Sequence, residues 1–403
     1  MAPWSWLHRV AFRFAFLLFI ALAEVPTPLP MLPLLAEWVA DGWHWLGLQL
    51  GGALRLEVPM HGVSGSGDTL LEWLTALAKV LVALFGTVLW SAVQRKPTSH
   101  HKLADVLQLV LRVVLINMMF SYGISKVFAG QFPAPSDYRL AQTFGEASPM
   151  GLMWTFMGAS RPYQIFAGLA ECLGALLLLS RRTTLLGALW LIGVLGNVVL
   201  LNFFYDVPVK LFSSSLLAMA VMLALPDAPR LWRLLISNRP APAAERRWQF
   251  WANGPWWLAR VVLMTLLIGG NLYEAGDALV AEAGAFDAPP AAYEGVFDAT
   301  SAEAPFRRLG IGAWSVYVTL ADGSVQRLAI EADEKKPKLT ISPRAGEQGH
   351  SASLQWKREG DVVTFSGTWN GQPVEVVTRR LDLSKAVLVT RGFHWVNEFP
   401  FNR

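Results

Sequence analysis

The sequence predicts an all-α polytopic membrane bundle with about seven spans, followed by a small all-β domain outside the membrane. Hydrophobic residues make up 53% of the 403-residue chain and charged residues only 16%, against the ~25% that is usual in soluble domains. The apolar residues lie in runs of about 20, the length that a bilayer requires of a helix. From about residue 289 the pattern changes to short stretches in which apolar and polar residues alternate.

Composition also excludes several kinds of function. The formal net charge of +4 is small and the basic residues lie in predicted loops, so we expect no nucleic-acid partner. Cys172 is the only cysteine, which excludes an intramolecular disulfide and a cysteine-rich metal site, and we interpret it as a core residue. No predicted span contains a histidine, which argues against haem or copper in the bundle. We therefore expect no metal site.

Seven apolar runs have the length of a membrane span. They cover residues 9–24, 70–93, 104–127, 162–180, 183–204, 210–226 and 256–275. The first run is short and carries Arg13. Because Ala21-Leu22-Ala23 follows a basic start and resembles a signal-peptidase site, residues 1–23 are alternatively a cleaved signal.

The loop charges predict the orientation of the spans. Basic residues follow the second, fourth and sixth spans: Arg95, Lys96, Lys102, Arg181, Arg182, Arg230, Arg233, Arg239, Arg246 and Arg247. Such loops stay in the cytoplasm under the positive-inside rule. We therefore expect a cytoplasmic N-terminus and a C-terminal domain on the outer side.

Two further segments are apolar without being predicted to cross. Met31–Leu50 follows a proline-rich break and predicts an amphipathic helix lying on the outer surface. Gln131–Tyr163 is apolar but rich in glycine and proline, and we expect it to cap the outer mouth of the bundle. The predicted domains are residues 1–103, a four-helix core with its cap at 104–226, a loop and last span at 227–284, and the β-rich domain at 285–403.

The C-terminal domain carries the signals of an antiparallel sheet. Strands are predicted at Trp314–Leu320, Ser324–Ile330, Lys338–Ser342, Ser351–Lys357, Val362–Thr368 and Val374–Arg379. Asp322-Gly323, Glu359-Gly360 and Asn370-Gly371 are hairpin turn sequences between them. We expect a small sandwich or barrel. The aromatic terminus Gly392–Arg403 either docks on another part of the chain or forms a last strand.

Ionisable residues inside predicted spans are the main functional lead, because each one is costly in a bilayer. Lys79, Arg112, Lys126 and Glu171 lie in such positions. Estimated depth places Glu171 level with Arg112 and with Lys79, so we expect it to pair with one of them. The surplus positive charge would suit a bound anion, an enolate or a quinone carbonyl. Alternatively, the pair only fixes helix register, and Lys126 extends to the interface.

A second polar group surrounds the predicted hairpin between the fifth and sixth spans. Asn197, Asn202, Asp206 and Lys210 lie at or below this short connection. They either form a binding or gating group at an outer mouth or cap two helix ends, with Pro208 beginning the next helix. Capping is the slightly favoured interpretation.

Several strings in the central stretch resemble the DoxX-like family of bacterial membrane proteins. They are Tyr122–Lys126, Gln131–Ser136, Ser148–Met157, Gly168–Glu171 with Leu176–Arg182, and Asn197–Leu211. The terminal Gly392–Glu398 resembles a larger subgroup with an extra C-terminal domain. The resemblance implies a four-helix membrane module over the third to sixth spans, in a bacterial inner membrane with the β domain in the periplasm. Lys126, Glu171 and Arg182 fall on charged positions of the family pattern.

The family takes its name from a subunit of a thiosulfate:quinone oxidoreductase, and the resemblance therefore implies a link to membrane redox systems. Because this chain lacks paired cysteines and histidines within its spans, electron transfer would need a bound quinone or a partner subunit. The leading hypothesis is a protein that binds a quinone or similar lipid-soluble ligand in the bundle of the third to sixth spans, with Glu171 and Arg112 as its polar anchors and the outer cap closing the site. The alternatives are a non-enzymatic adaptor that recruits a periplasmic protein through its β domain, and a lipid or small-solute transporter.

Overall fold

The computed structural model describes residues 4–23, 33–59, 66–128, 130–243, 293–312, 315–333, 337–344 and 348–391, together with isolated positions between 262 and 276. The chain divides into two compact units. The first comprises residues 1–131 and 162–281, and the second comprises residues 132–161 and 282–403. Each unit has its own hydrophobic core.

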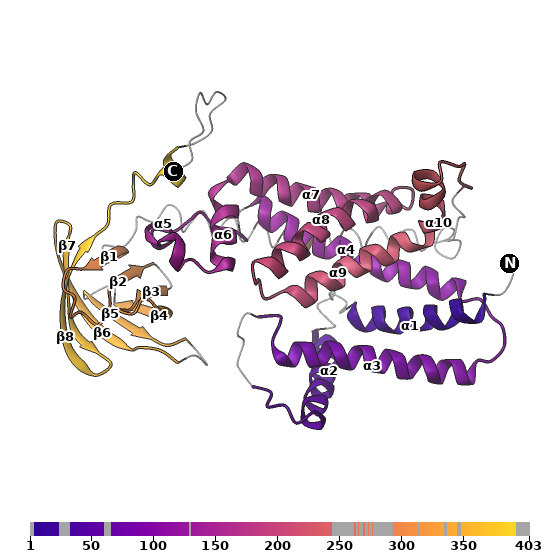
Figure 1. The fold of residues 1–403 in the computed structure, drawn as a ribbon, viewed down its shortest axis with the longest axis horizontal. Coiled ribbons are helices and arrows are strands. Elements are labelled where there is room, and N and C mark those ends of the chain that lie inside the picture. Colours follow the sequence, from indigo (N-terminus) through magenta and orange to yellow (C-terminus); the bar gives the residue numbers. More distant parts are fainter. Residues whose placement is uncertain are drawn as a thin grey trace. The chain divides into compact units, whose positions relative to one another are not determined.

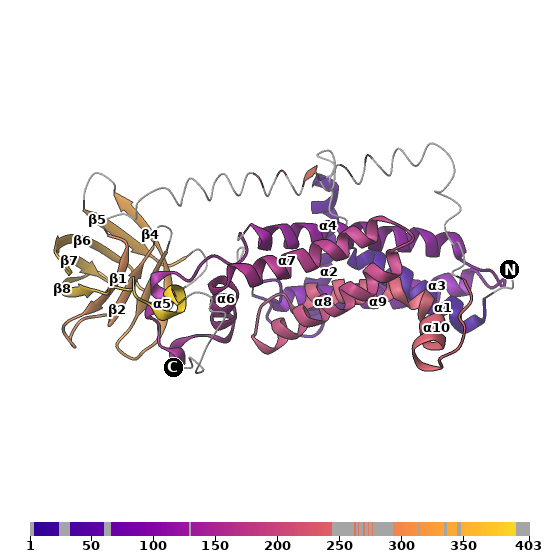
Figure 2. The ribbon, with the colours of Figure 1, turned by 90° about the horizontal axis from the view of Figure 1, so that it is seen from above.

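The first unit is helical in its described residues. Its longer helices are α1 (Trp6–Leu22), α2 (Pro33–Ala53), α3 (Leu70–Val93), α4 (His101–Val127), α7 (Arg161–Leu179), α8 (Thr184–Phe204) and α9 (Lys210–Ala224). A 3₁₀ turn (Leu225–Asp227), the short α10 (Ala228–Leu231) and a π-helical turn (Trp232–Ile236) continue α9. The helices α4, α7, α8 and α9 run alongside one another (Figures 1 and 2).

Five of the described helical segments are long and apolar enough to cross a membrane. They are α3, α4, α7, α8 and the run Lys210–Ile236 that begins with α9. The helix α1 corresponds to the predicted first span, and the predicted last span at 256–275 lies outside the described residues. The chain is therefore a membrane protein with a helical bundle, as the apolar runs predicted, while the total of seven spans remains a prediction.

Small residues allow neighbouring helices to approach closely. A Cβ atom on Gly174 of α7 would lie 2.2 Å from Leu191 of α8, and one on Gly187 of α8 would lie 2.9 Å from Leu177. The described part of the segment Met31–Leu50, residues 33–50, is helical as predicted, within α2. This helix packs across α3 at a steep angle, with Gly47 against Thr75 (Figures 1 and 2).

The second unit is built on a closed antiparallel β-barrel in which each strand pairs with its sequence neighbours and β8 returns to β1. The strands are β1 (Gly295–Ala299), β2 (Arg308–Ile311), β3 (Ser315–Thr319), β4 (Val325–Asp333), β5 (Lys338–Ser342), β6 (Ala352–Glu359), β7 (Val362–Trp369) and β8 (Gln372–Arg380). A short helix, α12 (Val387–Thr390), follows. Closure leaves no unpaired sheet edge.

The six predicted strands correspond to β3–β8, whereas β1 and β2 were missed. The turn sequences behave as their chemistry requires, because Gly323, Gly360, Asn370 and Gly371 all have positive φ. The missed strands are only five and four residues long, so neither shows much alternation. The predicted docking segment 392–403 lies outside the described residues.

The segment predicted to cap the bundle groups with the β-barrel in the second unit over residues 132–161. It forms α5 (Asp137–Ala141), a 3₁₀ turn (Phe144–Glu146) and α6 (Pro149–Ala159). Ser148 caps α6 by accepting from Gly151 N–H at 3.1 Å. The physical reason for the regrouping is Tyr138, which stacks on Tyr317 of β3 with ring centroids 4.4 Å apart.

Candidate functional site

An ion pair lies buried between α4 and α7. Lys126 Nζ donates to both carboxylate oxygens of Glu171, each at 2.8 Å, and the two residues are 7% and 3% exposed. The ammonium also lies 5.5 Å from the ring centroid of Tyr122, one helical turn earlier on α4. Glu171 therefore pairs with Lys126, and the predicted pairing with Arg112 or Lys79 was wrong.

The close approach of two glycines explains this pairing. A Cβ atom on Gly168 would lie 2.5 Å from the carbonyl oxygen of Gly123, so the two backbones nearly touch there. Lys126 and Glu171 each follow their glycine by three residues on helices that run in opposite directions. Because helical side chains lean toward the N-terminus of their own helix, the two side chains lean toward each other. Lys126 thus binds a partner rather than extending to the interface.

The other two predicted intramembrane cations have separate surroundings. Arg112 donates through Nε to the carbonyl of Leu178 at 3.0 Å and through Nη2 to that of Leu179 at 3.1 Å. These carbonyls belong to the last turn of α7, where helix carbonyls lack helical partners and the dipole favours a cation. Lys79 is 5% exposed, with its ammonium 5.9 Å from the ring centroid of Trp43 on α2. The structure therefore does not bring the four cation and anion candidates together.

At the α8–α9 connection the cap of α9 comes from Asp68, which lies outside the predicted polar group, and α9 begins at Lys210 rather than at Pro208. The backbone N–H groups of Lys210 and Leu211 donate to the carboxylate of Asp68 at 2.8 and 3.0 Å. The Lys210 ammonium contacts Asp206 at 2.8 Å, but that aspartate side chain is 82% exposed. Sequence reasoning missed Asp68, because it lies 142 positions before Lys210.

The two asparagines of this group lie apart from each other. Asn202 is buried and donates through Nδ2 to Ser213 Oγ at 3.0 Å, which links α8 to α9. Asn197 is exposed on α8. Neither residue joins the Lys126–Glu171 pair through a described hydrogen bond.

Two further buried polar residues were not predicted as site residues. Arg13 is 3% exposed and donates to Ser91 Oγ at 2.9 Å, so it joins α1 to α3. Gln164 is 1% exposed, and its Nε2 has no hydrogen-bond partner among the described residues. It precedes Glu171 by seven residues, which places both on one face of α7. The sequence signal for Arg13 was its position in an apolar run, whereas Gln164 resembles an ordinary residue of a helix start.

No group of three or more histidine, cysteine, aspartate or glutamate side chains that could hold a metal occurs among the described residues. The thiol of Cys172 lies against Gly123, where it fills the space that the glycine leaves. The chemistry of the bundle site therefore rests on an ammonium, a carboxylate and an unpartnered amide.

The uncharacterized protein YwoB of Bacillus subtilis (strain 168) is 35% identical over 121 residues, which cover 28% of this chain and 71% of the relative. No family model matches the sequence, and no solved structure matches it. The name of the relative states no ligand and no activity.

Proposed function

We infer that this chain, which belongs to the same family as the uncharacterized Bacillus subtilis protein YwoB, binds a quinone or a similar lipid-soluble carbonyl compound between its spans. It would do so as part of a membrane redox system. The resemblance to DoxX-like proteins supports that setting. The observation that carries the proposal is the buried Lys126–Glu171 pair with Gln164 on the same face of α7.

The donors at this site exceed the acceptors that the described residues supply. An ammonium has three N–H groups, and the two contacts of Lys126 with Glu171 leave one for another acceptor. The buried Gln164 amide is a second such donor, and leaving it unpaired costs ~1–3 kcal/mol. A ligand that offers a carbonyl oxygen and an apolar body would satisfy these donors without adding charge to the bundle.

The carboxylate gives the same site a means of moving protons. A quinone takes up two electrons and two protons when it is reduced, and Glu171 with Lys126 would hold protons next to its oxygen. The electrons would come from a redox partner subunit. The loop charges support a cytoplasmic N-terminus with the β-barrel on the outer side, and the apolar runs support seven spans. The resemblance to DoxX-like proteins supports a bacterial inner membrane, with the barrel in the periplasm.

Mass spectrometry of an organic extract from the full chain, purified in mild detergent, tests the proposal. We expect one lipid-soluble carbonyl compound per protein, lost in Glu171→Gln and in Gln164→Leu. The Gln164→Leu variant is the sharper test, because removing an unpaired buried donor should not lower stability. Asn197→Ala, at an exposed position of α8, is the control that should keep the ligand. An extract of the unaltered protein that holds only bulk phospholipid would contradict the proposal.

A non-enzymatic adaptor remains the second candidate. Its support is the closed barrel with a hydrophobic core of its own, which can present a surface to a periplasmic protein independently of the bundle. Because the barrel has no free edge, a partner would bind its side-chain surface rather than add a strand. Deleting residues 285–403 should then abolish co-purification of the partner while the helical unit still accumulates in the membrane.

A further inference from the structure

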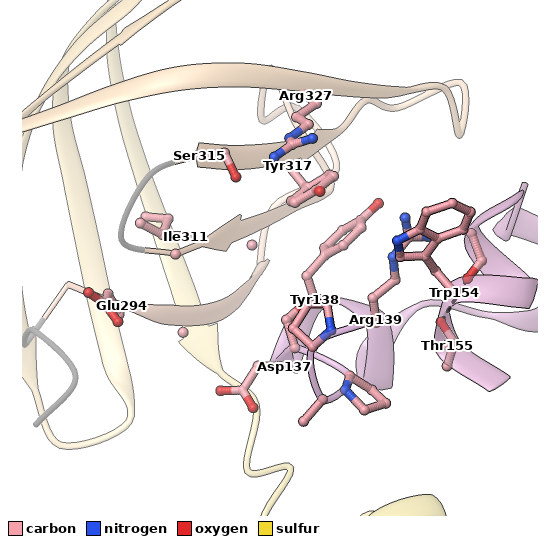
Figure 3. A pocket seen from close by; sticks show the side chains of 18 of the residues that line it. Asp137, Tyr138, Arg139, Trp154, Thr155, Glu294, Ile311, Ser315, Tyr317 and Arg327 are labelled. Carbon is pink, nitrogen blue, oxygen red and sulfur yellow. Dashed lines mark hydrogen bonds between the residues drawn. The ribbon is translucent and has the colours of Figure 1, made fainter. Parts of the chain in front are cut away.

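The second unit contains a cavity of about 820 Å³ between its helical segment and the barrel (Figure 3). Residues 133–139 and helix α6 form one side. Residues at the ends of β1, β2 and β8, with β3 and β4, form the other side. This volume lies within the ~300–1,000 Å³ of pockets that bind small molecules.

The barrel side of the cavity is organised around Tyr317. Strand register places Gly310, Tyr317 and Arg327 opposite one another on β2, β3 and β4. A Cβ atom on Gly310 would lie 2.5 Å from the ring of Tyr138, so the glycine makes room for that ring to stack on Tyr317. The guanidinium of Arg327 lies 5.6 Å from the Tyr317 ring centroid. Tyr317 is thus held between an aromatic ring and a cation (Figure 3).

Burial and hydrogen bonding make the helical side rigid as well. Tyr138 is 5% exposed, and burial raises its pKa while a hydrogen bond with Thr319 opposes that shift. Arg308, paired with Asp298, donates to the carbonyl of Ala141 at the end of α5. The cavity therefore has preformed walls, which lowers the entropic cost of binding a ligand.

Three arginines line the cavity, against two carboxylates. Arg139 is held by Gln142 at 3.0 Å, whereas Arg327 and Arg380 form no salt bridge with another residue of the described barrel and helical segment. Asp137 and Glu294 lie on the opposite side of the pocket from Arg327 (Figure 3). Arg380 lies near Glu294, because a Cβ atom on Gly295 would be 2.8 Å from its Nε. The positive side that is rich in aromatic rings is therefore the one around Arg327.

We propose that this cavity binds an organic oxyanion with an apolar body, and that Arg327 contacts its phosphate or carboxylate group. Arginine suits this role because its planar N–H groups match two oxygens at once. Trp154 and Met150 of α6 would cover the apolar part. The helical wall is itself the connection between α4 and α7, two helices apolar enough to cross a membrane. The ligand is accordingly an anionic lipid headgroup or a soluble anion of the same chemistry.

Binding to the full chain in a neutral detergent tests this proposal. The probes are dioctanoyl phosphatidylglycerol, dioctanoyl phosphatidylcholine as its zwitterionic counterpart, and inorganic phosphate, each titrated by calorimetry. We expect the anionic lipid to bind, and Arg327→Gln to weaken it by roughly ten- to a hundredfold. Arg327 is exposed, so its loss should leave the fold intact.

Arg379→Gln is the matched control, because this arginine is exposed on β8 next to Arg380 and does not line the cavity. Competition by inorganic phosphate would identify a soluble anion as the source, and binding without such competition would identify a lipid headgroup. Equal binding of the two lipids, or unchanged affinity in Arg327→Gln, would overturn the proposal. Glu171→Gln should not alter this binding, so the test is independent of the bundle site.

Discussion

Replacing Lys126 with methionine would leave the Glu171 carboxylate buried between α4 and α7 without its cation. Glu171 is 3% exposed, and both of its oxygens accept from Lys126 at 2.8 Å. Methionine retains a long unbranched side chain but offers no donor. The substitution therefore removes the charge at position 126 while it keeps most of the volume.

The expected loss follows from the burial of both partners. Removing one member of a buried ion pair costs ~3–5 kcal/mol, whereas replacing both with apolar residues is often neutral or stabilising. We expect Lys126→Met and Glu171→Leu each to lose about 3–5 kcal/mol of unfolding free energy. The double variant should be close to the unaltered protein, so the coupling energy should be several kcal/mol in favour of the pair.

The unfolding free energy of the four proteins can be measured by steric trapping in lipid bicelles. Lys357 and Glu359 supply a control cycle, because they form a 2.7 Å ion pair on the barrel with side chains 79% and 71% exposed. An exposed pair should show little coupling. If the losses of Lys126→Met and Glu171→Leu add in the double variant, the two residues do not act as a pair and the packing argument is refuted. A stable double variant without bound carbonyl compound would separate ligand binding from folding.

Three other perturbations test the packing and the caps. Gly168→Leu should lower the thermal midpoint and the unfolding free energy by at least ~1–3 kcal/mol, because its side chain would meet the α4 backbone 2.5 Å away. Asp68→Ala should cost ~0.5–2 kcal/mol, since it removes the cap of α9, measurable by the same unfolding assay. The pKa of the Glu146 carboxyl is lowered, mainly by a hydrogen bond from the backbone N–H of Thr143. A hydrogen bond from the Thr143 side chain and the charge of Arg307 lower it further. A carboxyl whose pKa is lowered by folding stabilises the folded state at pH values above its unfolded pKa of about 4.3. This stabilisation is lost as the pH falls from that value toward the folded pKa, so the amides of the turn should then lose protection from hydrogen exchange.

Each of these three predictions has a matched control. Gly193→Leu introduces the same side chain on α8, where a Cβ atom meets nothing within 4 Å, and should have little effect. Asp206→Ala removes a carboxylate that is 82% exposed and should cost less than the loss of Asp68. Glu146→Gln should remove the pH dependence of the protection factors in the turn, which are measured relative to intrinsic exchange rates. Equal effects in variant and control would contradict the corresponding argument.

The extents of most elements could be predicted because they depend on local pattern. The apolar run 70–93 has the same bounds as α3, and the run 183–204 differs from α8 by one residue. Alternation and Gly-containing turns likewise located β3–β8. Each of these signals reflects how one segment meets its own surroundings, apolar or aqueous, and requires no knowledge of its neighbours.

Contacts between distant segments depended on the tertiary structure. The sequence identified Glu171 as an intramembrane acid, but depth along a straight helix favoured Arg112 or Lys79 as its partner. The true partner, Lys126, was decided by the close approach of Gly123 and Gly168 and by the opposite directions of the two helices. The docking of Tyr138 on β3 was decided in the same way, by the space at Gly310. Side-chain type and position along the chain determined which groups are costly to bury. Helix crossing and strand register determined which other side chains pair with them or pack against them.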